Sequence, residues 1–136
     1  MKTFYVYTDA SLLPLKNFHA KAAVIVVDSH ITDVIYKERQ CKKIQASINY
    51  YERAAIIWAI KYVKRHYKTE NIIAYCDNKR AVNKGYREYN LKWIKGHSKY
   101  NNYKYKFQKL ADYVSKHGIS NWREYYYKYI LKWLIM

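Results

Sequence analysis

Strand-like alternation of apolar and polar residues dominates the first third of the chain. Residues 2–8 are rich in aromatic and β-branched side chains and predict a strand, with Asp9 at its end on the face shared by every second residue. Residues 10–20 predict a loop. Two further apolar runs, residues 22–27 and 31–39, are separated by a short polar turn and predict a hairpin.

Helical spacing replaces this alternation after residue 47. Ser47 or Asn49 can cap a long helix that ends near Tyr67. Its apolar positions recur every three or four residues, and Glu52 lies four residues before Ile56 on the same face. The pattern therefore places one carboxylate on the buried side of a helix.

Strands and helices alternate in the second half of the chain. Residues 71–76 form a continuous apolar run, typical of a strand covered on both faces, and Asp77 follows it directly. A short basic helix is expected at residues 78–88, a strand at 91–95 and a helix at 103–116. The buried stripe of that last helix is expected to comprise Phe107, Leu110, Ala111 and Val114, with Asp112 toward its rim.

The C-terminal residues predict one more amphipathic helix. Gly118 closes the preceding helix, and Ser120 is expected to cap the last one, over residues 120–135. Its apolar positions are Trp122, Tyr125, Tyr126, Tyr129, Ile130, Trp133 and Leu134. The whole order predicts an α/β fold, a mixed sheet flanked by helices, with residues 1–118 as one domain and residues 119–136 as a helix packed on it.

The net charge of the chain indicates which class of binding partner to expect. The chain has 26 Lys and Arg against 10 Asp and Glu, a formal net charge of +16, which favours a polyanion. Nucleic acid is the first candidate and an anionic membrane surface the second. Cys41 and Cys76 lack metal or redox spacing and are interpreted as reduced thiols. With neither a signal-peptide core nor a membrane span in the sequence, we expect a cytoplasmic protein without a membrane partner.

Carboxylates at the ends of buried elements need a positive partner. Asp9 and Asp77 follow predicted strands, and the helical Glu52 and Asp112 can reach them if the first and fourth strands are neighbours. Lysine or arginine could compensate these acids, and so could Mg²⁺ or Mn²⁺, which prefer oxygen ligands. Simpler interpretations remain open: turn formers at the two aspartates, a capping partner of Asn49 at Glu52, and a solvated residue at Asp112.

Five short motifs occur in an order that resembles ribonuclease H of type I, over about residues 3–117. The resemblance is to a minimal form that lacks the extra basic helix, because only about 13 residues separate Asp77 from the next strand. The motifs are Tyr7-Thr8-Asp9-Ala10-Ser11, Asn49-Tyr50-Tyr51-Glu52, Tyr75-Cys76-Asp77-Asn78, Trp93-Ile94-Lys95-Gly96-His97-Ser98 and Leu110-Ala111-Asp112.

The resemblance implies a five-stranded ribonuclease H-like fold and a site for two Mg²⁺ ions, with Mn²⁺ as a possible substitute. Asp9, Glu52, Asp77 and Asp112 would hold the ions, roughly 4 Å apart, and His97 would assist proton transfer or product release. Asn49 would contact RNA 2′-hydroxyl groups. The other expected substrate-binding residues are Ser11, Asn78, Lys79, Arg80, Lys84, Lys95 and Ser98.

Three positions depart from the family pattern. Ala10 replaces the usual glycine after the first aspartate, Ile48 replaces an asparagine, and Lys109 replaces a frequent glutamate. The predicted activity is hydrolysis of the RNA strand of RNA/DNA hybrids by a monomer, leaving 5′-phosphate and 3′-hydroxyl ends. The alternatives are a DNA-cutting nuclease of the same fold and a hybrid-binding module without turnover.

Overall fold

A mixed five-stranded sheet forms the centre of the molecule in the computed structural model, which describes residues 2–13, 18–41, 47–83, 89–94 and 103–131. The strand order is β3-β2-β1-β4-β5. β1 pairs antiparallel with β2 and parallel with β4, so the predicted neighbours are confirmed. The strands are β1 Phe4–Leu13, β2 Phe18–Val27, β3 Ile31–Cys41, β4 Ile72–Cys76 and β5 Asn90–Trp93.

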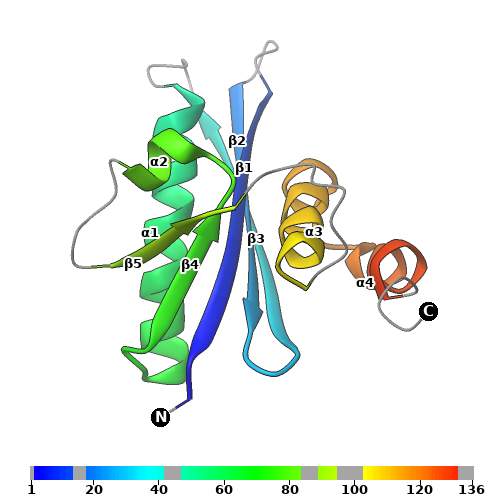
Figure 1. Ribbon diagram of the computed structural model, residues 1–136. Coiled ribbons are helices and arrows are strands. Elements are labelled where there is room, and N and C mark those ends of the chain that lie inside the picture. The colour runs from blue at the N-terminus through cyan, green and yellow to red at the C-terminus, as the bar shows by residue number, and fades with distance from the viewer. Residues whose placement is uncertain (1, 14–17, 42–46, 84–88, 95–102, 132–136) are drawn as a thin grey trace.

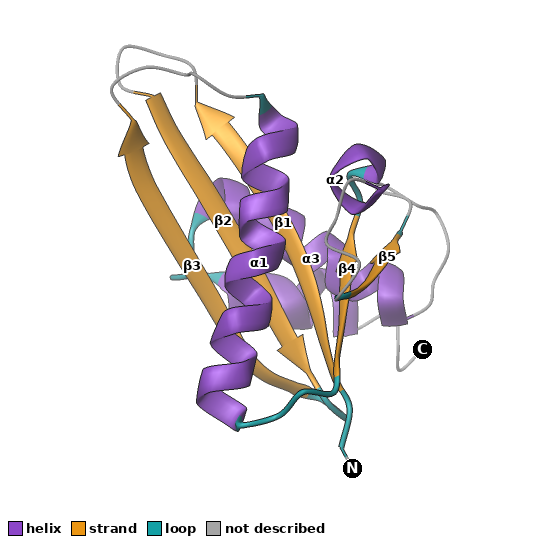
Figure 2. Cartoon of the chain, turned by 90° about the vertical axis from the view of Figure 1, so that its left-hand side faces the viewer, coloured by secondary structure: helices purple, strands orange, loops and turns teal. Residues whose placement is uncertain are grey.

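Helices cover both faces of this sheet (Figure 1). The long helix α1, Ile48–Tyr67, and the short helix α2, Lys79–Asn83, lie on one side, and α3, Tyr103–His117, lies on the other. Figure 2 shows α1 running across the antiparallel strands, with α2 near the ends of β4 and β5. The predicted architecture, a mixed sheet flanked by helices, is confirmed.

Two apolar clusters, one on each face, hold the layers together. Alternate residues of β1, such as Val6, pack with Ile56 and Val63 of α1. Tyr7, on the opposite face, packs with Phe107 and Leu110 of α3. The predicted stripe of α3 is fully buried, because helical spacing carries these side chains onto one face of the sheet.

Several predicted boundaries are wrong. The first strand continues to Leu13 and the second begins at Phe18, so most of the predicted loop at residues 10–20 is strand. Antiparallel pairing causes this: the chain after Asp9 finds partners along β2, from Ala10 opposite Ala22 to Leu13 opposite His19. Of the basic helix predicted at residues 78–88, the structure describes α2, Lys79–Asn83, and residues 84–88 lie outside the described part of the chain.

The C-terminal segment also differs from the single helix predicted. A four-residue helix α4, Trp122–Tyr125, is followed by a π-helical turn η1, Tyr126–Leu131. Asn121, and not Ser120, is the residue that precedes α4. The wider turn brings Ile130 into the core beside α3, whereas Tyr129, predicted to be apolar and packed, is 47% exposed.

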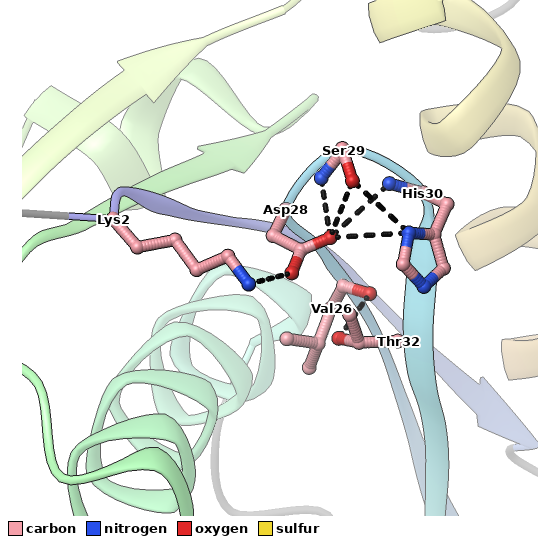
Figure 3. A network of polar contacts seen from close by, with 6 residues as sticks. All are labelled: Lys2, Val26, Asp28, Ser29, His30 and Thr32. Atoms are coloured by element: carbon pink, nitrogen blue, oxygen red, sulfur yellow. Dashed lines mark hydrogen bonds and ion pairs between the residues drawn. The ribbon is translucent and has the colours of Figure 1, made fainter.

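A compact polar turn joins β2 to β3 (Figure 3). The Asp28 carboxylate accepts hydrogen bonds from the backbone N–H groups of Ser29 and His30 and forms an ion pair with Lys2 at 2.9 Å. The Lys2 hydrogen bond, followed by those two backbone bonds, lowers the pKa of Asp28 even though burial opposes the shift. Each oxygen of this carboxylate therefore has a donor.

Candidate active site

The parallel β1–β4 ladder brings two predicted site residues together. Its last pair is Thr8 with Cys76, so Asp9 and Asp77 are the next residues on adjacent strands. Asp9 itself lies within β1 and not at a strand end, because its neighbour on the other side, Ala23 of β2, continues the antiparallel ladder. The sequence prediction of a strand-end aspartate is corrected, while the predicted adjacency holds.

Glu52 reaches this point from the second turn of α1. Its side chain is only 4% exposed, as is that of Asp9. The Cys76 thiol donates to Glu52 Oε2 at 3.5 Å. Asn49 lies inside the helix and Ser47 precedes it without a side-chain cap, so the capping alternative for Glu52 is not what the structure contains.

Asp112 approaches from α3 on the opposite face of the sheet. Its side chain is 28% exposed, and Oδ1 lies 3.1 Å from Nζ of Lys116, one turn further along the helix. Asp112 also lies close to Asp9, because a hydrogen bond between the two side chains contributes to the raised pKa of Asp9. Three other carboxylates, those of Glu52, Asp77 and Asp112, therefore converge around Asp9 from different parts of the chain.

Burial and mutual repulsion disfavour the charged forms of these acids. Burial, followed by the charges of Glu52 and Asp77, raises the pKa of Asp9 well above its usual range. Burial also raises the pKa of Glu52, against the opposing hydrogen bonds from Asp9 and Cys76. In the part of the chain that the structure describes, the ion pairs of Lys, Arg and His involve other acids and none reaches Asp9 or Glu52.

The donor atoms suit a divalent cation. A carboxylate oxygen of Glu52, a carboxylate oxygen of Asp77 and Sγ of Cys76 all lie within 4.8 Å of one another. Oxygen donors in a negatively charged, buried position favour Mg²⁺ or Mn²⁺. A bound dication would also offset the repulsion that raises these pKa values, which supports the fit of the residues to a metal.

Cys76 was missed as a site residue. Its spacing from Cys41 gives no metal signature, and only the packing of β4 against α1 places its thiol beside Glu52. Burial raises the pKa of this thiol, so it is a neutral hydrogen-bond donor at physiological pH. Its position at the last residue of a buried strand, directly before Asp77, is the one sequence signal that could have indicated it.

Two polar residues of α3 support Asp9 and were also missed. Ser115 Oγ lies 3.3 Å from Asp9 Oδ2 and 2.8 Å from the Asp112 carbonyl oxygen. Gln108 Nε2 donates to the Thr8 carbonyl oxygen at 2.8 Å, which ties α3 to the backbone of β1 next to Asp9. Both side chains are buried, and the spacing of seven between residues 108 and 115 puts them on one helix face.

Three predicted substrate-binding residues make internal contacts. Ser11 Oγ donates to the carbonyl oxygen of Ser115 at 2.7 Å. Asn78 Nδ2 donates to Asn49 Oδ1 at 2.7 Å, and Asn78 Oδ1 accepts from the Ala81 N–H at 2.9 Å, which caps α2. The bond between the two asparagines leaves the Asn49 amide group with two N–H donors for another partner.

The basic residues of α2 lie on the same edge. Lys79 and Arg80 are exposed, and Lys79 Nζ lies 5.4 Å from the centre of the Trp93 ring. Trp93 Nε1 in turn donates to the Asp77 carbonyl oxygen at 3.1 Å, so β5 helps to fix the backbone of Asp77. The remaining predicted residues lie outside the described part of the chain: Lys84, Lys95, His97 and Ser98.

Comparison with known proteins relates the chain to others by structure alone. No family model matches the chain, and no curated protein matches it in sequence. The native crystal structure of prototype foamy virus protease-reverse transcriptase matches 87% of this chain with a TM-score of 0.69 at 12% identity. The chain spans only 21% of that longer protein.

Two further solved structures are similar. A foamy viral protease-reverse transcriptase in complex with dsDNA matches with a TM-score of 0.53 at 12% identity, over 88% of this chain and 94% of the other. LC11-RNase H1, isolated from compost by a metagenomic approach, matches with a TM-score of 0.46 at 17% identity, over 86% and 79% of the two chains. The observed strand order and flanking helices are those of the expected ribonuclease H-like fold, and the likeness to the two foamy viral structures, both with TM-scores above 0.5, agrees with it.

Proposed function

We propose that this chain is a divalent-metal-dependent endonuclease that hydrolyses the RNA strand of RNA/DNA hybrids, a ribonuclease H of type I in its minimal form. The observation that carries the proposal is the convergence of Glu52, Asp77 and Asp112 on the buried Asp9 in a protein of net charge +16. A small negative site inside a positive surface suits both the cations and the phosphates of a nucleic acid.

Four carboxylates would hold the metal: Asp9, Glu52, Asp77 and Asp112. When bound, two Mg²⁺ ions supply an activated water and stabilise the leaving 3′ oxygen. Neighbouring groups of the chain orient the carboxylates that would bind the metal. The Ala10 N–H donates to Asp9 Oδ1, and the Ser115 hydroxyl lies 3.3 Å from Asp9 Oδ2. The Cys76 thiol donates to Glu52 Oε2, so these contacts orient both carboxylates.

Recognition of the substrate is assigned to the edge formed by the start of α1 and by α2. The free N–H donors of Asn49 suit RNA 2′-hydroxyl groups, and Asn78 positions that amide through its own hydrogen bond. Lys79 and Arg80 would contact phosphates. Two further roles stay predictions from the sequence. Substrate binding is predicted for Ser11, Lys84, Lys95 and Ser98, and assistance of proton transfer or product release is predicted for His97.

The proposed nuclease is one unit, and its action as a monomer stays a prediction from the sequence. Trp122 and Tyr125 of α4 and Ile130 of η1 pack on the same cluster as α3, which supports the C-terminal segment as part of the domain. None of the helices in the described ranges has the length and apolarity that a membrane crossing requires.

One assay tests the function against its alternatives. Labelled RNA/DNA hybrid, duplex RNA and duplex DNA are each incubated with Mg²⁺, with Mn²⁺ or with EDTA. Cutting of the RNA in the hybrid alone, in metal and not in EDTA, is the expected result. Cutting of DNA would instead favour a resolvase-like or transposase-like nuclease, and binding without product would favour a non-catalytic module.

A further inference from the structure

A groove of about 620 Å³ lies between α3 and the C-terminal segment formed by α4 and η1. Figure 1 shows α4 beside α3, on the side of α3 that faces away from the sheet. The volume of the groove is within the range of about 300–1,000 Å³ that is typical of ligand pockets. The catalytic proposal above makes no use of this groove except at one end, where Asp112 forms part of its wall.

Aromatic rings form one wall of the groove as a short ladder. The rings of Tyr113 and Tyr125 stack with centroids 3.9 Å apart and planes 7° apart. The ring of Tyr129 follows with its centroid 5.2 Å from that of Tyr125 and its plane tilted by 41°, and its side chain is 47% exposed. An exposed ring beside other aromatic rings is a platform on which an unpaired base can stack.

Polar side chains around these rings suit the other parts of a nucleotide. Asn121 and Glu124 offer an amide and a carboxylate that can hydrogen-bond the edge of a base. Lys128 offers a cation for a phosphate, and its Nζ lies 5.4 Å from the centre of the Tyr129 ring. Lysine beside an exposed tyrosine is the combination found where proteins hold single strands.

The groove is continuous with the acid cluster. Asp112 contributes to the surroundings of Asp9 on one side and lines the groove on the other, and its ion pair with Lys116 lies at the boundary. We propose that the groove binds a single-stranded nucleic-acid segment that continues from the strand held at the acid cluster. This inference rests on the nuclease function proposed above and adds a substrate preference, for hybrids that carry an unpaired extension.

The test compares a blunt RNA/DNA hybrid with the same hybrid carrying a single-stranded RNA extension at either end, by fluorescence anisotropy in EDTA. The extension is expected to tighten binding about tenfold through stacking. Tyr129→Ala and Lys128→Glu should each remove most of that gain. The matched controls are Tyr127→Ala, whose ring is 61% exposed but lies outside the groove, and Lys61→Glu on α1, and both should retain the gain.

Equal affinity for blunt and extended hybrids, or an unchanged gain in both groove variants, would overturn the inference. Tyr129→Phe keeps the ring and should keep the gain, which separates lost stacking from a misfolded C-terminal segment. Because binding is measured without metal, the two proposals fail separately. Extension-dependent binding without cutting in Mg²⁺ would refute the nuclease function and support single-strand binding in the groove. Cutting without any effect of the extension would support the nuclease function and refute binding in the groove.

Discussion

Two groups of acidic residues in this molecule are surrounded very differently. At the β2–β3 turn, Asp28 forms an ion pair with Lys2 and accepts hydrogen bonds from two backbone N–H groups, and these contacts lower its pKa (Figure 3). At the end of the β1–β4 ladder, Asp9 and Glu52 are buried beside other carboxylates, and their pKa values rise. The first arrangement stabilises the fold, whereas the second costs stability, a cost that the proposed metal would offset.

The largest difference is expected in cleavage. Asp77→Asn removes a charged ligand from the cluster and should lower hybrid cleavage by about a thousandfold or more, because metal binding contributes several kcal/mol to such transition states. Asp28→Asn, the same substitution at the compensated acid, should leave cleavage unchanged. Single-turnover rates in Mg²⁺ measure both, and circular dichroism checks that both variants are folded. Comparable losses in the two variants would contradict the assignment.

The next largest difference concerns the response of stability to metal. Mg²⁺ at a hundred times its dissociation constant should stabilise the wild-type protein by about 2.7 kcal/mol, because it binds the folded state alone. Asp28→Asn should respond in the same way, and Asp77→Asn should respond weakly or not at all. Thermal unfolding with and without Mg²⁺ provides the measurement, and an equal response in Asp77→Asn would argue against the site.

A smaller effect is expected from the residue that holds Asp9. Ser115→Ala removes the hydroxyl beside Asp9 Oδ2 and should raise the Mg²⁺ concentration needed for half-maximal cleavage about tenfold. The maximal rate at saturating Mg²⁺ should change less, since Ser115 is a positioning residue. Ser29→Ala, beside the compensated Asp28, is the matched control and should leave the Mg²⁺ dependence unchanged. A shift in neither variant would remove Ser115 from the account.

The smallest effect is a dependence of metal-free stability on pH. Raised pKa values mean that folded Asp9 and Glu52 keep protons that the unfolded chain has lost, so stability should fall as the pH rises from roughly 5 to 8. Asp77→Asn should flatten this fall. Asp28 has the opposite sign: its contribution is present above the unfolded pKa of about 4 and is lost in acid. Denaturant unfolding in EDTA from roughly pH 2 to pH 8 would reveal both. A wild-type stability that rises from roughly pH 5 to pH 8 would contradict the account.

The sequence was sufficient for the layers of the fold because burial follows periodicity. The continuous apolar run of β4 and the stripe of α3 both lie where their patterns predict. The end of β1 was predicted wrongly because local sequence signals such as Pro14 predict a loop, whereas the length of the strand depends on pairing with β2. The π-helical turn η1 likewise depends on packing against α3 and has no counterpart in the helical spacing.

The candidate site was only partly accessible from the sequence. Asp9, Glu52, Asp77 and Asp112 were recognisable because carboxylates on buried elements are rare and fall within motifs. The residues that hydrogen-bond to these carboxylates were not recognisable from the sequence. Ser115 is an ordinary helix residue until α3 is placed across β1, and Cys76 is an ordinary buried thiol until α1 brings Glu52 beside it.

Isothermal titration calorimetry of Mg²⁺ into the metal-free protein tests the central claim most directly. The account predicts saturable binding to the wild-type protein and to Asp28→Asn, and the loss of that binding in Asp9→Asn. Equal Mg²⁺ binding by the wild-type protein and Asp9→Asn, or no binding by a folded wild-type protein in the presence of hybrid, would contradict it.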